Sequence, residues 1–339
     1  MVVDVGALKF PGGKSAAAVA ARAAETKAQE LAWAQYYAAV AGEIEQCLAQ
    51  LDAAVLTAGA GSRTIAVIGS KGGSNKTTVA ASLLHFLSAA VRMLTVGVDL
   101  NPNVSTLPGR FVARPDAGVG RLVDLAGKAA DVQYPMDLDR FLQPAPGRVH
   151  LVHNTGGGVD RLRVAGTSRS ELDAVLTRLS LLAQLLVLDT GNSHVDQYFS
   201  AAIDAADHLV VAALGYNDSL STLEDSFKEL DARGYRRQLK TATVVIGIDK
   251  PDVDPAELAP AVTRWGRLCG AAFLVPYDSA LDGGGVIDWA ALAPATRLPL
   301  LQASVHAASA FTRPALRHDP ADPDTDTETG QGPGGWAAR

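Results

Sequence analysis

Cysteine is scarce in this chain, and the two that occur are far apart. Cys47 and Cys269 are the only cysteines among 339 residues, and neither belongs to a paired-cysteine spacing. Two isolated thiols exclude a disulfide framework and a cysteine-ligated zinc cluster as the basis of the fold. With so little cysteine, the chain is expected in the reducing cytoplasm.

Long apolar runs are also missing. Hydrophobic residues make up 48% of the chain, yet no run approaches the ~20 apolar residues that a bilayer-spanning helix needs. The N-terminus lacks a basic stretch followed by an apolar one. The sequence therefore predicts neither a transmembrane segment nor a secretory signal.

Positive charge is in deficit, with a net charge of -6 at pH 7 and a pI of about 5.6. A protein whose whole surface binds nucleic acid is usually basic, so the charge does not indicate DNA as a partner. A local DNA-binding patch stays open, because four basic residues gather within 231–240: Arg233, Arg236, Arg237 and Lys240. The alternative is a solvated helix terminus, where basic residues are favoured in any case.

Composition divides the chain into a lead segment (1–13), an N-terminal helical segment (14–61), a domain (62–313) and a tail (314–339). The tail is rich in Pro, Asp, Thr and Gly and is expected to be disordered. Residues 14–57 carry an apolar stripe at helical spacing. This helix either packs on its own domain or binds a partner, and the tail is a second candidate for partner contact.

Strand-like and helix-like patterns alternate from residue 63 to 313. The predicted strands are Thr64–Gly69, Leu94–Asp99, Val149–Val152, Leu185–Asp189, His208–Ala213, Thr243–Ile248 and Ala272–Val275. The predicted helices are 76–91, 170–183, 195–206, 218–233, 255–268 and 295–311. Several strands are near-continuous Val, Ile and Leu runs, as in strands covered by helices on both faces. The alternation predicts an α/β fold with a doubly wound, mostly parallel sheet, and 103–148 as irregular chain with short helices.

The stretch "IAVIGSKGGSNKTTVAASLL" (65–84) resembles a phosphate-binding loop between a strand and a helix. Gly72 and Gly73 let backbone N–H groups close around phosphate oxygens. Lys76 is placed to reach the β- and γ-phosphates, and the Thr77 hydroxyl to ligate Mg²⁺. The N-terminus of the helix that follows adds partial positive charge facing the anion.

Asn75 stands where such loops usually carry glycine. Asn is among the few other residues that readily visit positive φ, so we expect the loop shape to survive at a strain of ~1 kcal/mol. The alternative, a Gly-Asn loop without a ligand, is disfavoured by the preceding strand, Lys-Thr-Thr and the following helix.

Lys71 lies five residues before Lys76, where ordinary phosphate loops have no fixed lysine. Here the sequence resembles the deviant Walker A motif, K-G-G-x-G-K-T-[ST], of the ParA/MinD ATPases. "VGVDLNP" (96–102), "LLVLDTGN" (185–192) and "VPYDSALDGGGVIDWAAL" (275–292) resemble further family segments, in family order. Their details are most similar to the actinobacterial branch, which includes ATPases associated with type VII (ESX) secretion.

The resemblance implies ATP and Mg²⁺ as ligands and assigns roles to single residues. Lys71 is expected to cross a dimer interface and touch the partner's ATP, so that two subunits enclose two ATP molecules until hydrolysis separates them. Thr77 is expected to ligate Mg²⁺ directly, and Asp189 to orient it through water. Asp99 is expected to lie near the metal and the attacking water. The expected nucleotide-binding set is Gly72, Gly73, Ser74, Asn75, Lys76, Thr77, Thr78 and Pro276.

One departure concerns hydrolysis. The family's second aspartate, in D-x-D-P, is Asn101 here. An amide cannot accept a proton, but phosphoryl transfer depends mainly on positioning and electrostatics. We therefore expect a slow ATPase, with a hydrolysis-deficient nucleotide-binding scaffold as the alternative. The partner assembly is left open between secretion-associated regulation and chromosome or plasmid partition.

Overall fold

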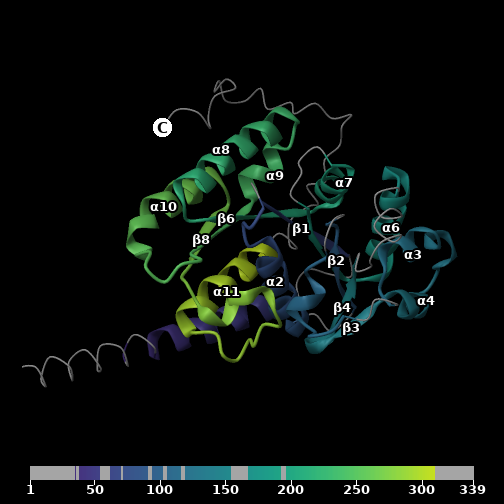
Figure 1. Cartoon of the computed structure of the whole chain (residues 1–339), viewed down its shortest axis with the longest axis horizontal. Coiled ribbons are helices and arrows are strands. Elements are labelled where there is room, and N and C mark those ends of the chain that lie inside the picture. Colours follow the sequence, from purple (N-terminus) through teal and green to yellow (C-terminus); the bar gives the residue numbers. More distant parts are fainter. Residues whose placement is uncertain are drawn as a thin grey trace, which may run out of the picture. The chain divides into compact units, whose positions relative to one another are not determined.

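Eight strands within the described residues form a single sheet in the order β3-β4-β2-β5-β1-β6-β7-β8 (Figure 1). Their bounds are β1 (Arg63–Gly69), β2 (Thr95–Asp99), β3 (Gln143–Ala145), β4 (Val149–Val152), β5 (Leu185–Asp189), β6 (His208–Leu214), β7 (Thr243–Gly247) and β8 (Ala271–Val275). Every pairing is parallel except that of β3 with β4. The predicted doubly wound, mostly parallel sheet is confirmed, and all seven predicted strands are present within one residue of their predicted ends.

The structure is a computed structural model that describes residues 35, 38–53, 62–69, 72–90, 94–101, 105–115, 119–153, 167–191 and 196–309. The chain divides into two units, Met1–Gln46 and Cys47–Arg339, and the sheet belongs to the second. The predicted lead segment, most of the N-terminal segment and the predicted tail lie outside the described residues. Residues 38–53 are helical, as predicted.

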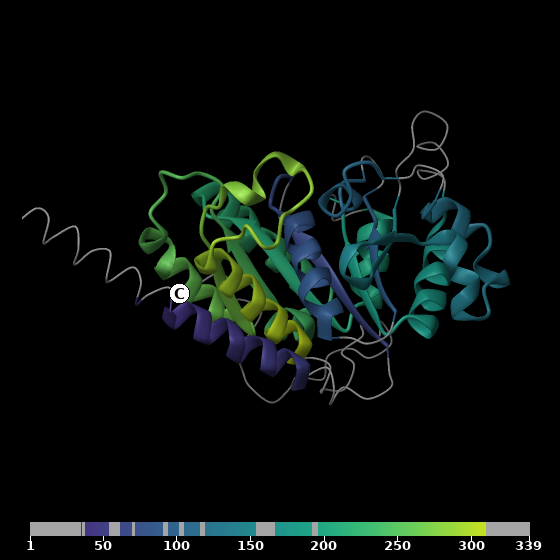
Figure 2. The ribbon, with the colours of Figure 1, turned by 90° about the horizontal axis from the view of Figure 1, so that it is seen from below.

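Helices cover both faces of the sheet. The longer ones are α2 (Lys76–Ala90), α6 (Arg169–Leu182), α7 (Gln197–Ala205), α8 (Asn217–Ala232), α10 (Ala259–Leu268) and α11 (Pro294–Ser309). The shorter ones are α3 (Leu122–Ala126), α4 (Pro135–Leu138) and α9 (Arg236–Thr241). Figure 1 shows α2 and α11 on one side of the sheet and α7, α8, α9 and α10 on the other. In Figure 2, α2 and α11 lie side by side, and the two helices are in contact.

The central strands are buried throughout, which explains their near-continuous apolar sequences. Every residue of β2, β5, β6 and β7 is buried, as expected for parallel strands covered on both faces.

Helix boundaries follow local capping chemistry. At the start of α6, the Ser168 hydroxyl accepts from the Glu171 N–H, and the Glu171 carboxylate accepts from the Ser168 N–H. This reciprocal pair satisfies two otherwise unpaired donors.

Two elements were not predicted from the sequence. Strand β3 pairs antiparallel with β4 at one edge of the sheet, and its three residues, Gln-Pro-Ala, carry no strand signal. Its central Pro144 is tolerated because an edge strand can dispense with one N–H donor. Helix α9 follows α8 after a turn at Gly234, whose φ is 91°. The prediction of irregular chain with short helices over 103–148 is otherwise confirmed by α3, α4 and several 3₁₀ turns, including η2 (Pro108–Arg110).

The basic run at 231–240 is partly neutralised by acidic neighbours. Arg236 makes two hydrogen bonds to the Asp231 carboxylate, of 2.7 and 2.9 Å. Arg233 lies 3.8 Å from Glu229 and donates to the Ser200 hydroxyl. These contacts favour the solvated helix terminus over a DNA-binding patch.

Among the described residues, no helix combines the length and the apolar character needed to cross a bilayer.

Candidate functional site: a phosphate loop beside two buried aspartates

The loop between β1 and α2 folds back over the end of β1. A Cβ built on Gly69 would lie 2.2 Å from the Ser74 hydroxyl oxygen and 2.8 Å from Cγ of Lys76. Only glycine therefore allows the loop to close this tightly over the strand. A close turn of this kind, with a helix N-terminus behind it, presents backbone N–H groups to an anion. Gly72 and Gly73 belong to this turn, whereas Lys71 lies outside the described residues.

Asn75 adopts the left-handed backbone conformation that the sequence predicted for it. Its φ is 62°, and that of Gly73 is 78°. Asn75 also faces the end of β7, because a Cβ built on Gly247 would lie 3.0 Å from the Asn75 amide nitrogen. The loop shape therefore survives the replacement of glycine, since Asn tolerates positive φ better than most residues. The Asn75 side chain also lines a neighbouring pocket.

Lys76 is the first residue of α2, and its side chain is almost entirely buried, with 7% of the residue exposed. Its Nζ lies 3.5 Å from the Ser74 hydroxyl oxygen. Burial lowers the pKa of Lys76, and the charge of Asp189 acts against that shift. A largely desolvated ammonium inside a loop of N–H donors is suited to binding a phosphate oxygen.

Asp99 and Asp189 end adjacent strands and are register partners in the pairing of β2 with β5. Both are fully buried, and burial, followed by the charge of Asp99, raises the pKa of Asp189 to about 8. The Thr77 hydroxyl and the cations of Lys76 and Arg110 act in the opposite direction. In the part of the chain that the structure describes, Oδ1 of Asp189 is buried without a hydrogen-bond partner. A carboxylate oxygen in that situation is suited to holding a cation or its water.

The Asp99 carboxylate holds the loop that follows β2. Its Oδ2 accepts hydrogen bonds from the Ser105 hydroxyl (2.7 Å), the Thr106 N–H (2.8 Å) and the Leu107 N–H (3.0 Å). Its Oδ1 accepts from the Asn101 N–H at 3.0 Å. Burial raises the pKa of Asp99, and these four hydrogen bonds counteract the rise. Asp99 therefore acts as a clamp that fixes Asn101 and residues 105–107 beside the phosphate loop.

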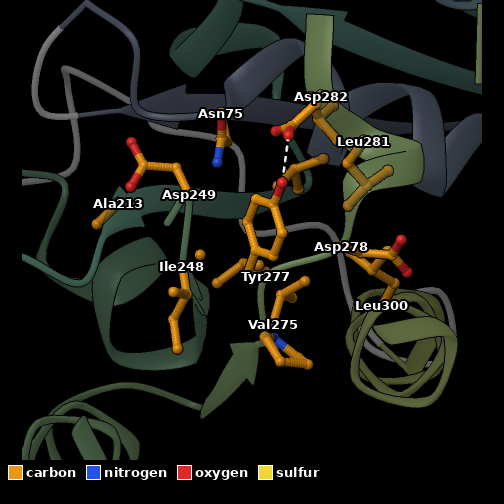
Figure 3. A pocket seen from close by; sticks show the side chains of 15 residues that line it. Asn75, Ala213, Ile248, Asp249, Val275, Tyr277, Asp278, Leu281, Asp282 and Leu300 are labelled. Atoms are coloured by element: carbon orange, nitrogen blue, oxygen red, sulfur yellow. Dashed lines mark hydrogen bonds between the residues drawn. The ribbon is translucent and has the colours of Figure 1, made fainter. Parts of the chain in front are cut away.

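A pocket opens on the opposite side of the phosphate loop, between the ends of β7 and β8. Its lining includes Asn75 and Thr78 from the loop and α2, Asp249 after β7, and Pro276 and Tyr277 after β8. Figure 3 shows the Tyr277 ring within the pocket and its hydroxyl directed at Asp282, to which it donates a hydrogen bond. The predicted residues Thr78 and Pro276 thus line a cavity adjoining the phosphate loop.

The tertiary structure brings most of the predicted site residues together. Around the loop they are Gly72, Gly73, Ser74, Asn75, Lys76, Thr77 and Thr78, with Asp99 and Asp189 on one side and Pro276 on the other. Three residues were missed. Tyr277 lies in the 275–292 segment that resembles a family segment, but it was not itself named. Asp249 carries no strict motif and reaches the pocket because β7 and β8 are parallel neighbours. Arg110 lies in an irregular stretch without any pattern, yet interacts electrostatically with Asp189.

No protein-family model matches the chain, and no curated protein matches its sequence. Solved structures do match. A ParA-family ATPase from Chlorobium tepidum TLS matches with a TM-score of 0.60 at 14% identity, over 73% of this chain and 98% of that chain. The cell division ATPase MinD from Pyrococcus furiosus gives 0.54 at 16% identity, over 71% and 98%. The Cyanothece McdA(D38A)–ATP complex gives 0.54 at 19% identity, over 73% and 97%.

These matches establish the fold, because almost the whole of each solved chain is covered although few residues are identical. The chain shares the fold of these ParA-family and MinD ATPases, and within its described residues that fold is an eight-stranded, mostly parallel sheet flanked by helices.

Proposed function

We propose that this chain is an ATP-binding switch that dimerises on binding ATP, hydrolyses it slowly, and regulates or positions a partner assembly. One observation carries the proposal. The loop closes over Gly69, and Lys76 and Thr77, at the start of α2, both interact with the Asp189 carboxyl group, whose Oδ1 has no hydrogen-bond partner among the described residues. A phosphate cradle, a buried cation and an unpartnered carboxylate oxygen converge there.

The nucleotide would lie across the carboxyl ends of the strands. Its base would enter the pocket lined by Thr78 and Pro276, and its phosphates would lie on the N–H groups of Gly72, Gly73, Ser74 and Asn75. Lys76 supplies the charge for the outer phosphates. Ligands of open α/β sheets bind in such crevices at the carboxyl ends of the strands.

The residues present fit Mg²⁺. Thr77 would offer a hydroxyl oxygen to the ion, Asp189 would hold one of its waters, and Asp99 is the register partner of Asp189 in the pairing of β2 with β5. Oxygen donors of this kind suit Mg²⁺, which usually retains several waters. When bound, the ion neutralises charge that develops on the phosphate oxygens.

Slow turnover follows from Asn101. Its backbone N–H is held by Asp99, so residue 101 is fixed at the site, but its side chain is an amide that cannot take a proton. Loss of a positioning group of this kind commonly costs ~10²-fold in rate. The same observation supports the second candidate, a scaffold that binds ATP without turning it over.

Dimerisation rests on Lys71, which we propose reaches the phosphates of the partner subunit's ATP. The partner assembly is either a type VII secretion system or a partition apparatus. The fold match with ParA-family and MinD ATPases supports a positioning role in general. Salt-dependent DNA binding in the presence of ATP would favour partition.

The test uses purified full-length chain and its Lys76→Ala and Lys71→Ala variants. Lys128→Ala serves as the matched control, because the Lys128 side chain is 60% exposed and pairs only loosely with Asp131, at 3.6 Å. We expect Mg-ATP binding and slow phosphate release in the wild type, and neither in Lys76→Ala. Light scattering should show a dimer with Mg-ATP in the wild type and a monomer in Lys71→Ala. Binding without phosphate release would select the scaffold, and a wild type that binds no nucleotide would overturn the proposal.

A further inference from the structure

Arg110 is half-buried, and two nitrogens of its guanidinium are fully buried. Within the described part of the protein, these two atoms, Nε and Nη1, have no hydrogen-bond partner. A guanidinium carries five N–H donors and stays charged under all ordinary conditions. Leaving such donors buried and unpaired is costly, so a site that retains them is suited to binding an anion.

The main chain of Arg110 is fixed on both sides. Upstream, the Thr106 and Leu107 N–H groups are held by Asp99, and the Thr106 hydroxyl lies 3.0 Å from that of Thr77. At Arg110 itself, the carbonyl oxygen accepts a hydrogen bond from the Ile287 N–H at 3.0 Å. Arg110 therefore sits on a short 3₁₀ turn tied to the phosphate-loop helix and to the segment that follows the pocket.

The order of the sheet gives the direction in which a nucleotide would extend. The pocket lies at the ends of β7 and β8, the phosphate loop follows β1, Asp189 ends β5, and Arg110 follows β2. These strands are arranged β2-β5-β1-β6-β7-β8 across the sheet. A nucleotide with its base in the pocket thus points its last phosphate toward β2, the side from which Arg110 approaches.

Two cationic side chains and two buried carboxyl groups meet at this end of the site. Lys76 and Arg110 both interact with the carboxylate of Asp189, and Asp99 stands beside it. A terminal phosphate adds negative charge that Lys76 alone would have to neutralise. A second cation on the β2 side supplies the complement, and a planar fork can bind two oxygens of one phosphate group.

We propose that Arg110 binds the terminal phosphate of the nucleotide from within the same subunit and so distinguishes ATP from ADP. This inference rests on the proposed function, and it assigns to Arg110 a role separate from that of Lys71, which acts across the interface. Because Arg110 is bonded through its carbonyl to Ile287, the contact also couples the phosphate end of the site to the segment after the pocket.

The test compares dissociation constants for Mg-ATP and Mg-ADP in the wild type, Arg110→Lys and Arg110→Gln, measured by displacement of a fluorescent nucleotide. Arg236→Lys is the matched control, because Arg236 is paired with Asp231 on α8. Loss of one charged hydrogen bond should raise the dissociation constant for ATP about tenfold. The constant for ADP should stay within about twofold of the wild-type value, and the control should behave as wild type.

Each outcome decides the matter. Weaker ATP binding with unchanged ADP binding supports the inference and shows that the variants are folded. Equal weakening for both nucleotides, or no change for either, overturns it, because a structural role does not discriminate between them. A wild type that binds neither nucleotide refutes the proposed function itself. A wild type that binds both, with an unchanged ATP-to-ADP ratio in Arg110→Lys, refutes only the role of Arg110.

Discussion

The hydroxyl oxygens of Thr77 and Thr106 lie 3.0 Å apart, which joins the first turn of α2 to the loop after β2. The two residues come from segments that are both tied to buried aspartates. Asp99 holds the Thr106 N–H, and the Thr77 hydroxyl interacts with Asp189. The orientation of Thr77, the proposed Mg²⁺ ligand, is therefore set by residues that follow β2, the strand next to β5.

Thr106→Val should therefore weaken the metal dependence of nucleotide binding. Without its partner hydroxyl, Thr77 loses a hydrogen bond of about 1 kcal/mol, equivalent to about a fivefold change in an equilibrium constant. We expect the Mg²⁺ concentration for half-maximal ATP binding to rise by about that factor in a titration. Thr222→Val removes a similar exposed hydroxyl, one that donates to the Asp218 carbonyl, and should have no effect. A normal Mg²⁺ titration of Thr106→Val would show that the hydroxyl pair has no role.

Replacements of Asn75 should separate backbone strain from side-chain contact. At a φ of 62° alanine is strained, whereas glycine is not. Asn75→Ala should lower the free energy of unfolding by about 1–2 kcal/mol relative to Asn75→Gly. Asn75→Gly should stay close to wild type, because its relief of strain is offset by the larger entropy of the unfolded chain. Urea unfolding of all three proteins measures this, and an alanine variant as stable as the glycine variant would contradict the left-handed conformation.

Gly69→Ala should disrupt the phosphate loop. Its Cβ would lie 2.2 Å from the Ser74 hydroxyl oxygen, so the loop must move. We expect nucleotide binding to fall at least tenfold, measured by calorimetry, with the far-ultraviolet circular dichroism spectrum preserved. Gly266→Ala is the control, since its Cβ would meet no atom closer than 3.8 Å. In the interior of α10 it should add about 1 kcal/mol of stability. Unaltered nucleotide binding in Gly69→Ala would contradict the closed loop.

The two buried aspartates predict a pH dependence of stability in the protein without nucleotide or metal. Burial and the charge of Asp99 raise the pKa of Asp189 to about 8, against about 3.9 in an unfolded chain. Between these values the folded state holds a proton that the unfolded state has lost. The free energy of unfolding should therefore fall as the pH rises from about 4 to about 8.

Asp189→Asn removes this titration and should flatten the profile. We expect urea unfolding at pH 5, 6.5 and 8 to show that the free energy of unfolding of the variant increases relative to that of the wild type as the pH rises. The relative change should be on the order of a few kcal/mol. Asp252→Asn, at an exposed position, should keep the wild-type slope. If the free energy of unfolding has the same pH dependence in the wild type and in Asp189→Asn, the raised pKa of Asp189 is wrong.

Strand β5 and Arg110 show which features could be predicted from the sequence and which could not. The Leu-Leu-Val-Leu-Asp run predicts β5 with its correct ends, because a strand buried on both faces must be apolar along its whole length. No comparable rule applies to Arg110. It lies in a stretch where short 3₁₀ turns replace regular periodicity, and its partners come from β5 and from the segment around Ile287.

Local chemistry along the chain determined seven of the eight described strands, the longer helices, the phosphate loop and the positive φ of Asn75, since each depends on residues close in sequence. Only the tertiary structure decided that Asp99 clamps a loop and that Thr77 and Arg110 both interact with Asp189, one of whose oxygens has no hydrogen-bond partner among the described residues. These relations depend on strand order. Strands far apart in the chain become neighbours in the sheet, and no local pattern records which strands they will be.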